Sequence, residues 1–235
     1  MLRWEKRRTW KKVLVRSAES GFQIFLDEKP IETPNKNLIV VPTKKLADAL
    51  AKEWKTQKKV VGFKKMVFNK LVNSSIDQVT VSRTSIIEIL IEYGDTDLLC
   101  YRAEDPPDLC LLQETQWGPV LNWLEKTFSI NLKVYSGVIY EPQEEQQLQQ
   151  LKNILQVYSD FEIAALHELV TISGSLIIGL AVKNKALTLQ EAWNRAILDE
   201  SWQMQKWGKD QESLDRLNLR RKEFNAAYDF LKLLE

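Results

Sequence analysis

Few residues of this sequence have side chains and spacing that could support catalysis. Asp95 and Asp97 form a D-x-D pair, which can hold a divalent metal beside a nucleotide diphosphate in glycosyltransferases. Glu88 and Glu92 lie four residues apart and would share one face of a helix, as an acid–base pair could. The alternative is that the aspartates end a helix and occupy a polar turn, while the glutamates are ordinary exposed charges. We favour this alternative because no partner nucleophile is visible.

The single histidine and the two cysteines do not suggest a reactive centre either. His167 precedes a glutamate at the entry of an apolar segment, and we interpret it as a hydrogen-bonded structural histidine. Cys100 and Cys110 lie in apolar surroundings without a C-x-x-C motif, which excludes a structural zinc site and favours small buried thiols over a disulfide. The sequence has no G-x-S-x-G motif, Walker loop or G-x-G-x-x-G motif. It therefore predicts a protein that is not an enzyme and that needs no cofactor or metal.

The composition is that of an ordinary globular protein. The 235 residues include 33 Lys+Arg and 32 Asp+Glu, and 44% are hydrophobic. The longest uncharged apolar segment, Leu169–Val182, is shorter than the roughly 20 residues that span a bilayer, so we expect no membrane insertion. The N-terminus does not resemble a secretory signal.

Charge is distributed unevenly along the chain. Residues 1–65 hold 17 Lys+Arg against 7 Asp+Glu, and the rest of the chain holds 16 against 25. Trp4 and Trp10 lie among the arginines and could stack on bases, so a nucleic-acid-associated protein is one alternative. A solvated helix surface is the simpler explanation of the lysines, and the near-zero net charge does not favour polyelectrolyte binding by the whole surface. We therefore expect no nucleic-acid partner.

The periodicity of apolar residues predicts an α+β fold with two domains. β-rich runs at Lys12–Arg16 and Phe22–Leu26, followed by two further extended runs up to residue 42, predict three or four antiparallel strands. Thr43 is positioned to cap a helix whose apolar stripe is formed by Leu46, Leu50 and Trp54. We therefore expect a small antiparallel β-rich N-terminal domain with one helix, over residues 1–75.

Residues 76–235 predict a mainly helical C-terminal domain. Gly94 is expected to end a first helix as a left-handed residue, and Gly118 and Pro119 to start another over Val120–Phe128. Lys133–Tyr140 has β-like character. Four long helices are expected to follow, over Glu144–Tyr158, Phe161–Val182, Thr188–Lys206 and Asp210–Leu234.

Two features suggest recognition rather than catalysis. The small residues from Ser173 to Gly179 would allow another helix to approach closely, which we interpret as internal packing. In the segment Asp199–Gly208, Trp202 and Trp207 lie beside polar residues, a composition typical of protein-binding surfaces. The alternative for these tryptophans is the core of a helical bundle.

Three strings of the sequence carry a family resemblance. They are YGDTDLLCYRA (Tyr93–Ala103), LHELVTISGSLIIGLAV (Leu166–Val182) and DESWQMQKWGKD (Asp199–Asp210). With GFQIFLDEKPIETPNKNLIVVPT, Glu53-Trp54 and LVNSSID, they make the chain resemble the assembly chaperone of the F-type ATP synthase catalytic sector, over almost its whole length. Val67 and Gly118 depart from the family's usual proline and aspartate, which puts only local geometry in doubt.

The resemblance implies both a partner and a binding segment. Members of this family occur in mitochondria and α-proteobacteria and act on the α subunit, so it implies a chaperone that holds unassembled α until the β subunit replaces it, without ATP hydrolysis. With the resemblance, we expect a protein of the bacterial cytoplasm, or of the mitochondrial matrix if the source is a eukaryote, that is monomeric when free. It also implies that an acidic residue of the late helix is functional, and the matching position is Glu200. We expect Glu200, Gln203, Trp207 and Asp210 to form or support the contact with the α subunit, and Trp54 and Tyr93–Arg102 to be structural.

Overall fold

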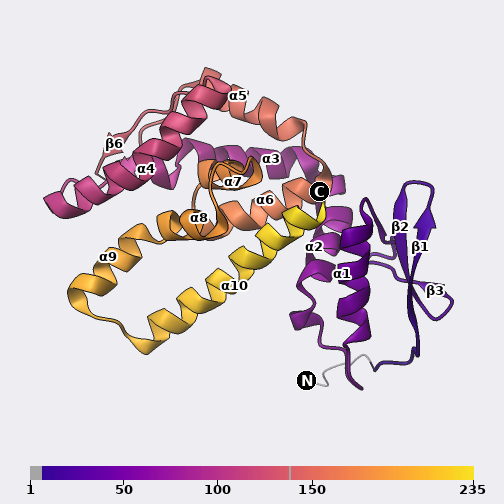
Figure 1. Cartoon of the computed structure of the whole chain (residues 1–235). Coiled ribbons are helices and arrows are strands. Elements are labelled where there is room, and N and C mark those ends of the chain that lie inside the picture. The colour runs from indigo at the N-terminus through magenta and orange to yellow at the C-terminus, as the bar shows by residue number, and fades with distance from the viewer. Residues whose placement is uncertain (1–6, 138) are drawn as a thin grey trace. The chain divides into compact units, whose positions relative to one another are not determined.

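A computed structural model of the chain describes residues 7–137 and 139–235, and Val138 and the residues before Arg7, including Trp4, lie outside this range. The described chain forms two compact units (Figure 1). The first comprises the chain up to Arg83 with Ser159–Ala165 and Asp229–Glu235, and the second comprises Thr84–Tyr158 and Leu166–Tyr228. The first unit therefore includes two later segments that a division at residue 75 does not assign to it. The division of the chain into domains at residue 75 stays a prediction.

The first unit contains the small antiparallel sheet. Its strands are β1 (Val13–Ala18), β2 (Gly21–Leu26), β3 (Lys29–Pro30) and β4 (Val40–Val41). Strand β2 pairs with each of the other three, so the expected antiparallel sheet of three or four strands is confirmed. A Cβ atom on Gly21 would lie 2.3 Å from the carbonyl oxygen of Val41, and Gly21 has φ +150°. Only glycine therefore fits where β2 meets β4.

Helix α1 (Lys44–Lys55) covers this sheet and contacts β1 and β2. The Leu46 backbone N–H donates to Thr43 Oγ1 (3.2 Å), which confirms the expected cap. Leu46, Leu50 and Trp54 are buried, as the apolar stripe predicts. Helix α1 is followed by η1 (Phe63–Lys65), α2 (Val67–Ser74) and η2 (Ser75–Val79).

The Glu53-Trp54 pair holds helix α2 against α1. Carboxylate oxygens of Glu53 accept the backbone N–H groups of Phe68 (3.0 Å) and Asn69 (2.9 Å), in the first turn of α2, where no preceding side chain provides a cap. Burial raises the pKa of Glu53 although these hydrogen bonds oppose the shift. The Trp54 indole N–H donates to Asn69 Oδ1 (3.0 Å), so both residues of the pair are structural.

The second unit is mainly helical, as expected. Its elements, some of which extend beyond the unit, are α3 (Thr80–Asp95), η3 (Leu98–Cys100), β5 (Tyr101–Arg102), α4 (Pro107–Phe128), β6 (Tyr135–Ser136), α5 (Glu145–Gln156), α6 (Asp160–Ser173), α7 (Leu176–Lys183), α8 (Leu189–Ala196), α9 (Leu198–Trp207) and α10 (Gln211–Leu233). Helix α7 contacts α4 and α8, and every residue from Leu176 to Val182 is buried. The second half of the apolar segment noted in the sequence thus belongs to this unit's core.

The roles expected of two glycines were wrong. Gly94 does not end a helix in the left-handed region but lies inside α3, where an added Cβ would come within 3.1 Å of methyl groups of Leu151 and Leu176. Gly118 and Pro119 do not begin a helix, because α4 runs unbroken from Pro107 to Phe128. A proline inside a helix removes one hydrogen bond. Pro106 and Pro107 instead mark the start of α4, where a missing N–H has no cost.

Two of the four long helices expected after residue 143 are each divided. The helix expected over Phe161–Val182 becomes α6 and α7, because Gly174 adopts φ +73° and Ser175 Oγ accepts the Ile178 N–H (2.9 Å) as a new cap. The helix expected over Thr188–Lys206 becomes α8 and α9, which meet at Ile197. In the described part of Lys133–Tyr140, which leaves out Val138, the β-like character is confirmed at β6, which pairs in parallel with β5.

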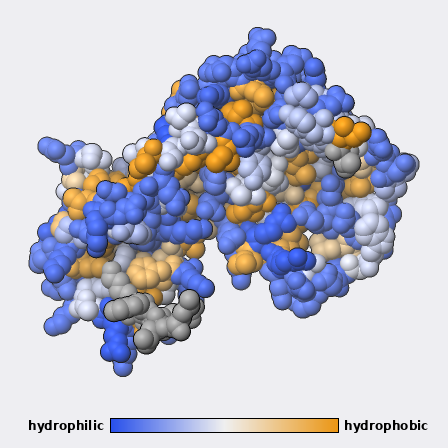
Figure 2. Space-filling model, turned by 180° about the vertical axis from the view of Figure 1, so that it is seen from behind, coloured by the Kyte–Doolittle hydropathy of each residue, from blue (hydrophilic) through white to orange (hydrophobic). Residues whose placement is uncertain are grey.

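Hydrophilic residues cover much of the face shown in Figure 2, with hydrophobic residues gathered in smaller groups between them. Within residues 7–137 and 139–235, no helix combines the length and the apolar character that a membrane crossing requires.

Candidate functional site

Helix α9 places three of the four expected site residues on one face. Glu200, Gln203 and Trp207 follow one another at spacings of three and four residues, so their side chains fall on one stripe of the helix. The helix begins directly after the bend at Ile197 and ends at Gly208, whose φ of +93° terminates it. Most of the family-like segment Asp199–Asp210 is therefore one short helix, and Gly208 determines where this helix ends.

The fourth expected residue, Asp210, begins the next helix. Its Oδ1 accepts the Ser213 backbone N–H (2.9 Å), and its carbonyl oxygen accepts the Leu214 N–H, as at the N-terminus of α10. Hydrogen bonds from Ser213 hold the pKa of Asp210 below its usual value. Asp210 thus fixes the turn between α9 and α10 rather than presenting a free carboxylate.

All four expected residues line one pocket of about 520 Å³ between α9 and α10. We call it the α9–α10 pocket, and Figure 1 shows the two helices that form it. Its remaining lining residues are Met204, Gly208, Ser213, Arg216, Leu217 and Arg220. A pocket of this size can accept one or two side chains of a partner.

An ion pair joins the two helices across this pocket. Arg220 Nη1 lies 2.8 Å from Glu200 Oε1, and Arg220 Nη2 donates to the carbonyl oxygen of Ile172 (3.0 Å) in the last turn of α6. The side chains of Arg220 and Glu200 remain 38% and 44% exposed. An exposed pair of this kind contributes only about 0–1 kcal/mol to stability. The Glu200 carboxylate can therefore exchange its partner at little cost to the fold.

The two tryptophans of α9 differ in exposure. Trp202 is half-buried, and Trp207 is 76% exposed and packs edge-to-face against Trp202 with ring centroids 5.8 Å apart. The interpretation that both belong to a core is therefore wrong for Trp207. A large aromatic side chain exposed beside arginine and methionine is typical of protein-binding hot spots.

The neighbours Asp199 and Glu200 lie in different environments. Asp199 Oδ1 accepts a hydrogen bond from Gln113 Nε2 on α4 (2.8 Å), and burial raises the pKa of Asp199. Glu200 faces the α9–α10 pocket and its partner is Arg220. Of the two adjacent acids, Asp199 anchors α9 and Glu200 is presented at the surface.

Comparison with known proteins identifies the family of this chain. The family model described as "ATP12 chaperone protein" matches residues 7–125. The chain is similar to the crystal structure of Atp12 from Paracoccus denitrificans, with a TM-score of 0.94 and 33% identity over 99% of this chain and 100% of that one. The chain belongs to the ATP12 chaperone family.

Two further ATP12 relatives extend the comparison. An aspartate-to-lysine mutant of P. denitrificans Atp12p also superposes with a TM-score of 0.94, over 97% of this chain and 98% of that one, with 33% identity. The mitochondrial protein atp12 of Schizosaccharomyces pombe is 24% identical over 94% of this chain and 81% of its own length. The family model ends before α9, but the structural likeness covers nearly the whole chain, so the α9–α10 pocket lies within the ATP12 fold.

The D-x-D pair of this ATP12-family chain holds the fold together. Asp97 is fully buried, and its oxygens accept the backbone N–H groups of Leu99 and Ile177 (each 3.0 Å). Asp95 accepts the backbone N–H of Gln143 (2.7 Å) and the Tyr140 hydroxyl (2.5 Å). Among the described residues, no group of three or more His, Cys, Asp or Glu side chains could hold a metal. The aspartates therefore have structural roles, although they are not simple exposed helix caps.

Trp10 is one of the two aromatic residues on which the nucleic-acid alternative depends, and it is not available to bases. Trp10 is only 6% exposed and packs edge-to-face on Trp54, so its ring faces cannot stack on bases. Trp4 lies outside the described residues. Cys100 is buried and Cys110 is half-buried, and both are free thiols, as the apolar surroundings predict.

Sequence reasoning missed the residues that α10 contributes to the pocket. Arg216 and Arg220 are four residues apart and share a helix face, a signal visible in the sequence. Their pairing with α9 depends on the short connection from Gly208 to Asp210, which brings distant faces together. Only the structure shows that pairing.

Proposed function

We propose that this ATP synthase assembly chaperone binds the unassembled α subunit through the α9–α10 pocket. The observation that carries the proposal is that Glu200, Gln203, Trp207 and Asp210 line one pocket in which Trp207 is 76% exposed. Exposed Trp, Met and Arg side chains around a hollow are the composition of a protein-binding surface. The client inserts apolar side chains beside Trp207 and Met204, and its charged groups pair with Glu200 or Arg220.

The chemistry of the client explains why such a surface is needed. A subunit that alternates with another in a ring exposes apolar interfaces before assembly, and such surfaces aggregate or pair wrongly. By covering the surface of α that later faces β, the chaperone prevents both outcomes. Release needs no ATP hydrolysis, because a β subunit that buries more surface and binds more tightly displaces the chaperone.

Co-expression tests the function directly. The α subunit of the same source is expressed with this chain, alone and with β, and the products are separated by size exclusion. We expect a soluble one-to-one complex with α that disappears when β is added. Aggregation of α in the presence of the chaperone, with no complex, would contradict the proposal.

A charge swap distinguishes a binding role of Glu200 from a structural one. The Glu200→Lys variant breaks the pair with Arg220, and the double variant Glu200→Lys, Arg220→Glu restores an ion pair of opposite direction. If Glu200 and Arg220 contact the client, both variants lose the complex. Recovery of the complex in the double variant would instead mean that the pair serves only to join α9 to α10.

A further inference from the structure

A group of basic side chains lies at the end of helix α1 in the first unit. Between Asp48 and Asp77 the sequence contains one acid, Glu53, whose carboxylate accepts backbone N–H groups of α2. Exposed lysines follow one another from the last turn of α1 to η1, at Lys52, Lys55, Lys58, Lys59, Lys64 and Lys65. None of these six lysines has an ion-pair partner within residues 7–137 and 139–235, whereas Lys44, at the start of α1, pairs with Asp48 (2.7 Å).

The fold brings an arginine of the N-terminal segment to these lysines. Arg7 is exposed and forms an antiparallel bridge with Val60. The Arg8 backbone N–H donates to the carbonyl oxygen of Lys59 (3.0 Å). Two basic stretches that are far apart in the sequence thus lie side by side. We call Arg7 and the six lysines the basic cluster.

Hydrogen bonds hold the backbone of the basic cluster in place. Arg8 Nη1 donates to the carbonyl oxygens of Lys55 (3.2 Å) and Gln57 (2.7 Å). Gln57 Oε1 accepts the Gly62 N–H (2.8 Å), which closes the loop between α1 and η1. The folded loop therefore sets the positions of the charges.

The stability of α1 explains only two of these lysines. Lys52 and Lys55 lie in its last turn, where the helix dipole favours positive charge. Lys58 and Lys59 lie beyond the helix, and Lys64 follows in η1, so a solvated face of α1 does not account for them. Like charges gathered without acids repel one another, which costs stability. An anionic partner removes this cost.

Two apolar side chains are exposed among the charges. Val60 follows Lys59 directly and is 43% exposed, and Phe63 precedes Lys64 and is 45% exposed. Lysines that surround exposed aromatic and aliphatic side chains are typical of surfaces that lie on a membrane. The lysines are attracted to anionic headgroups, and the apolar side chains enter the boundary between headgroups and acyl chains.

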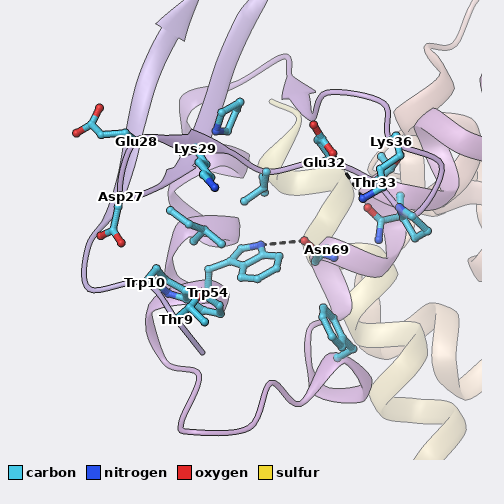
Figure 3. Close-up of a pocket in the computed structure, with 16 residues that line it drawn as sticks. Thr9, Trp10, Asp27, Glu28, Lys29, Glu32, Thr33, Lys36, Trp54 and Asn69 are labelled. Atoms are coloured by element: carbon cyan, nitrogen blue, oxygen red, sulfur yellow. Dashed lines mark hydrogen bonds and ion pairs between the residues drawn. The ribbon is translucent and has the colours of Figure 1, made fainter. Parts of the chain in front are cut away.

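A nucleic-acid partner fits these residues less well. Trp10 and Trp54 are only 6% and 4% exposed, and Figure 3 shows the Trp54 indole N–H directed at Asn69. Neither ring can therefore stack on a base. The Arg8 guanidinium is bonded to carbonyl oxygens within the chain. The basic cluster offers mostly lysine ammonium groups, which act as point charges and suit a layer of headgroup phosphates.

We propose that the basic cluster binds the surface of a membrane that contains anionic phospholipids. The lysines pair with headgroup phosphates, and Val60 and Phe63 enter the headgroup region. The contact is peripheral and reversible, because its attraction is mainly electrostatic. The basic cluster shares no residue with the α9–α10 pocket, so its test does not depend on the function proposed above.

Co-sedimentation of the full chain with lipid vesicles tests this inference. The vesicles are phosphatidylcholine alone, or phosphatidylcholine with about 30% phosphatidylglycerol, at a salt concentration of about 0.15 M. We expect binding to the anionic vesicles only, and a steep loss of binding as the salt concentration rises to about 0.5 M. Inorganic phosphate, oligouridylate and oligoglutamate are added as competitors at constant ionic strength. We expect none of them to displace the chain from the vesicles.

A triple variant measures the contribution of the charges. Lys58→Gln, Lys59→Gln and Lys64→Gln together should weaken vesicle binding about 100-fold, since each lysine near an anionic surface contributes about 5-fold. The matched control changes three exposed lysines outside the basic cluster, Lys126→Gln, Lys209→Gln and Lys222→Gln, and loses the same net charge. We expect the control to bind the vesicles as the wild type does.

A second variant separates a membrane from other anionic partners. Val60→Ser removes exposed apolar surface but no charge, and should weaken vesicle binding about 3- to 10-fold. Circular dichroism shows whether each variant remains folded. All the substituted side chains are exposed, so we expect folding to be unchanged.

Several outcomes would overturn the inference. They are a lack of binding to the anionic vesicles, equal binding to both kinds of vesicle, and equal losses in the two triple variants. Displacement by inorganic phosphate would assign the basic cluster to a free anion. Displacement by oligouridylate or oligoglutamate, with no effect of Val60→Ser, would assign it to a nucleic acid or an acidic protein instead. A chain that forms the complex with α but binds no vesicles would contradict this inference only.

Discussion

Asp97 and Glu200 both lie in family-like strings of the sequence, but the structure uses them in opposite ways. Asp97 is fully buried and binds the backbone N–H groups that start η3 and α7. Glu200 is 44% exposed, and its partner is another side chain, Arg220, rather than the backbone. The comparison teaches that the burial of a carboxylate and the type of its partner separate a residue that holds the fold from one available to a client.

The largest effect on stability is expected at Asp97. Asp97→Ala leaves two buried backbone N–H groups without acceptors, so the free energy of unfolding should fall by about 4 kcal/mol. The matched variant Glu200→Ala removes only an exposed ion pair and should cost about 1 kcal/mol or less. Urea denaturation of both variants checks the difference. Equal losses would remove the distinction between the two acids.

The pH dependence of stability sharpens the same comparison. Burial raises the pKa of Asp97 from 3.8 to about 6, although hydrogen bonds from Ser175 and backbone groups oppose the shift. A raised folded-state pKa means that this residue's contribution is fully present below pH 3.8 and is lost as pH rises through 6. The stability of the wild type relative to Asp97→Asn, which cannot ionise, should therefore fall by about 2–3 kcal/mol between pH 4 and pH 7. If the difference in free energy of unfolding between the wild type and Asp97→Asn stayed constant from pH 4 to pH 7, the raised pKa of Asp97 would be contradicted.

Glu53 provides an intermediate case in the first unit. It is part-buried and accepts two backbone N–H groups of α2, so its role resembles that of Asp97 rather than that of Glu200. Glu53→Gln keeps the shape but replaces one acceptor by a donor, and should lower the free energy of unfolding by about 2 kcal/mol. Urea denaturation measures it, with the exposed Glu19→Gln as control. A change as small as that of the control would show that α2 needs no cap.

A smaller effect is expected where α9 ends. Gly208 has φ +93° and no atom within 4 Å of an added Cβ, so Gly208→Ala meets backbone strain but no clash. It should cost about 1 kcal/mol. Thermal unfolding measures this loss, and affinity for the α subunit should also fall because the turn positions Asp210. Unchanged affinity with reduced stability would show that the turn is not needed for binding.

Features that depend on residues close together in the sequence were predicted correctly. The β-rich runs, the Thr43 cap and the apolar stripe of α1 depend on neighbouring residues, and the structure confirms them. The expected site residues on α9 share a helix face for the same reason. Gly94 and Pro119 were misassigned because their roles depend on residues far along the chain or on a helix that continues through them. Arg220 was missed for a related reason, since its pairing with Glu200 spans 20 residues.

The measurement that tests the central claim most directly is a titration of purified α subunit into three forms of the chaperone: wild type, Glu200→Lys and Glu223→Lys. Glu223 is exposed on α10, lies outside the α9–α10 pocket and receives the same change of charge. We predict that Glu200→Lys weakens binding by about 10-fold or more, as a lost hot-spot residue does, with its stability nearly unchanged. We also predict that Glu223→Lys binds as the wild type does. Equal binding of the wild type and Glu200→Lys would contradict the account.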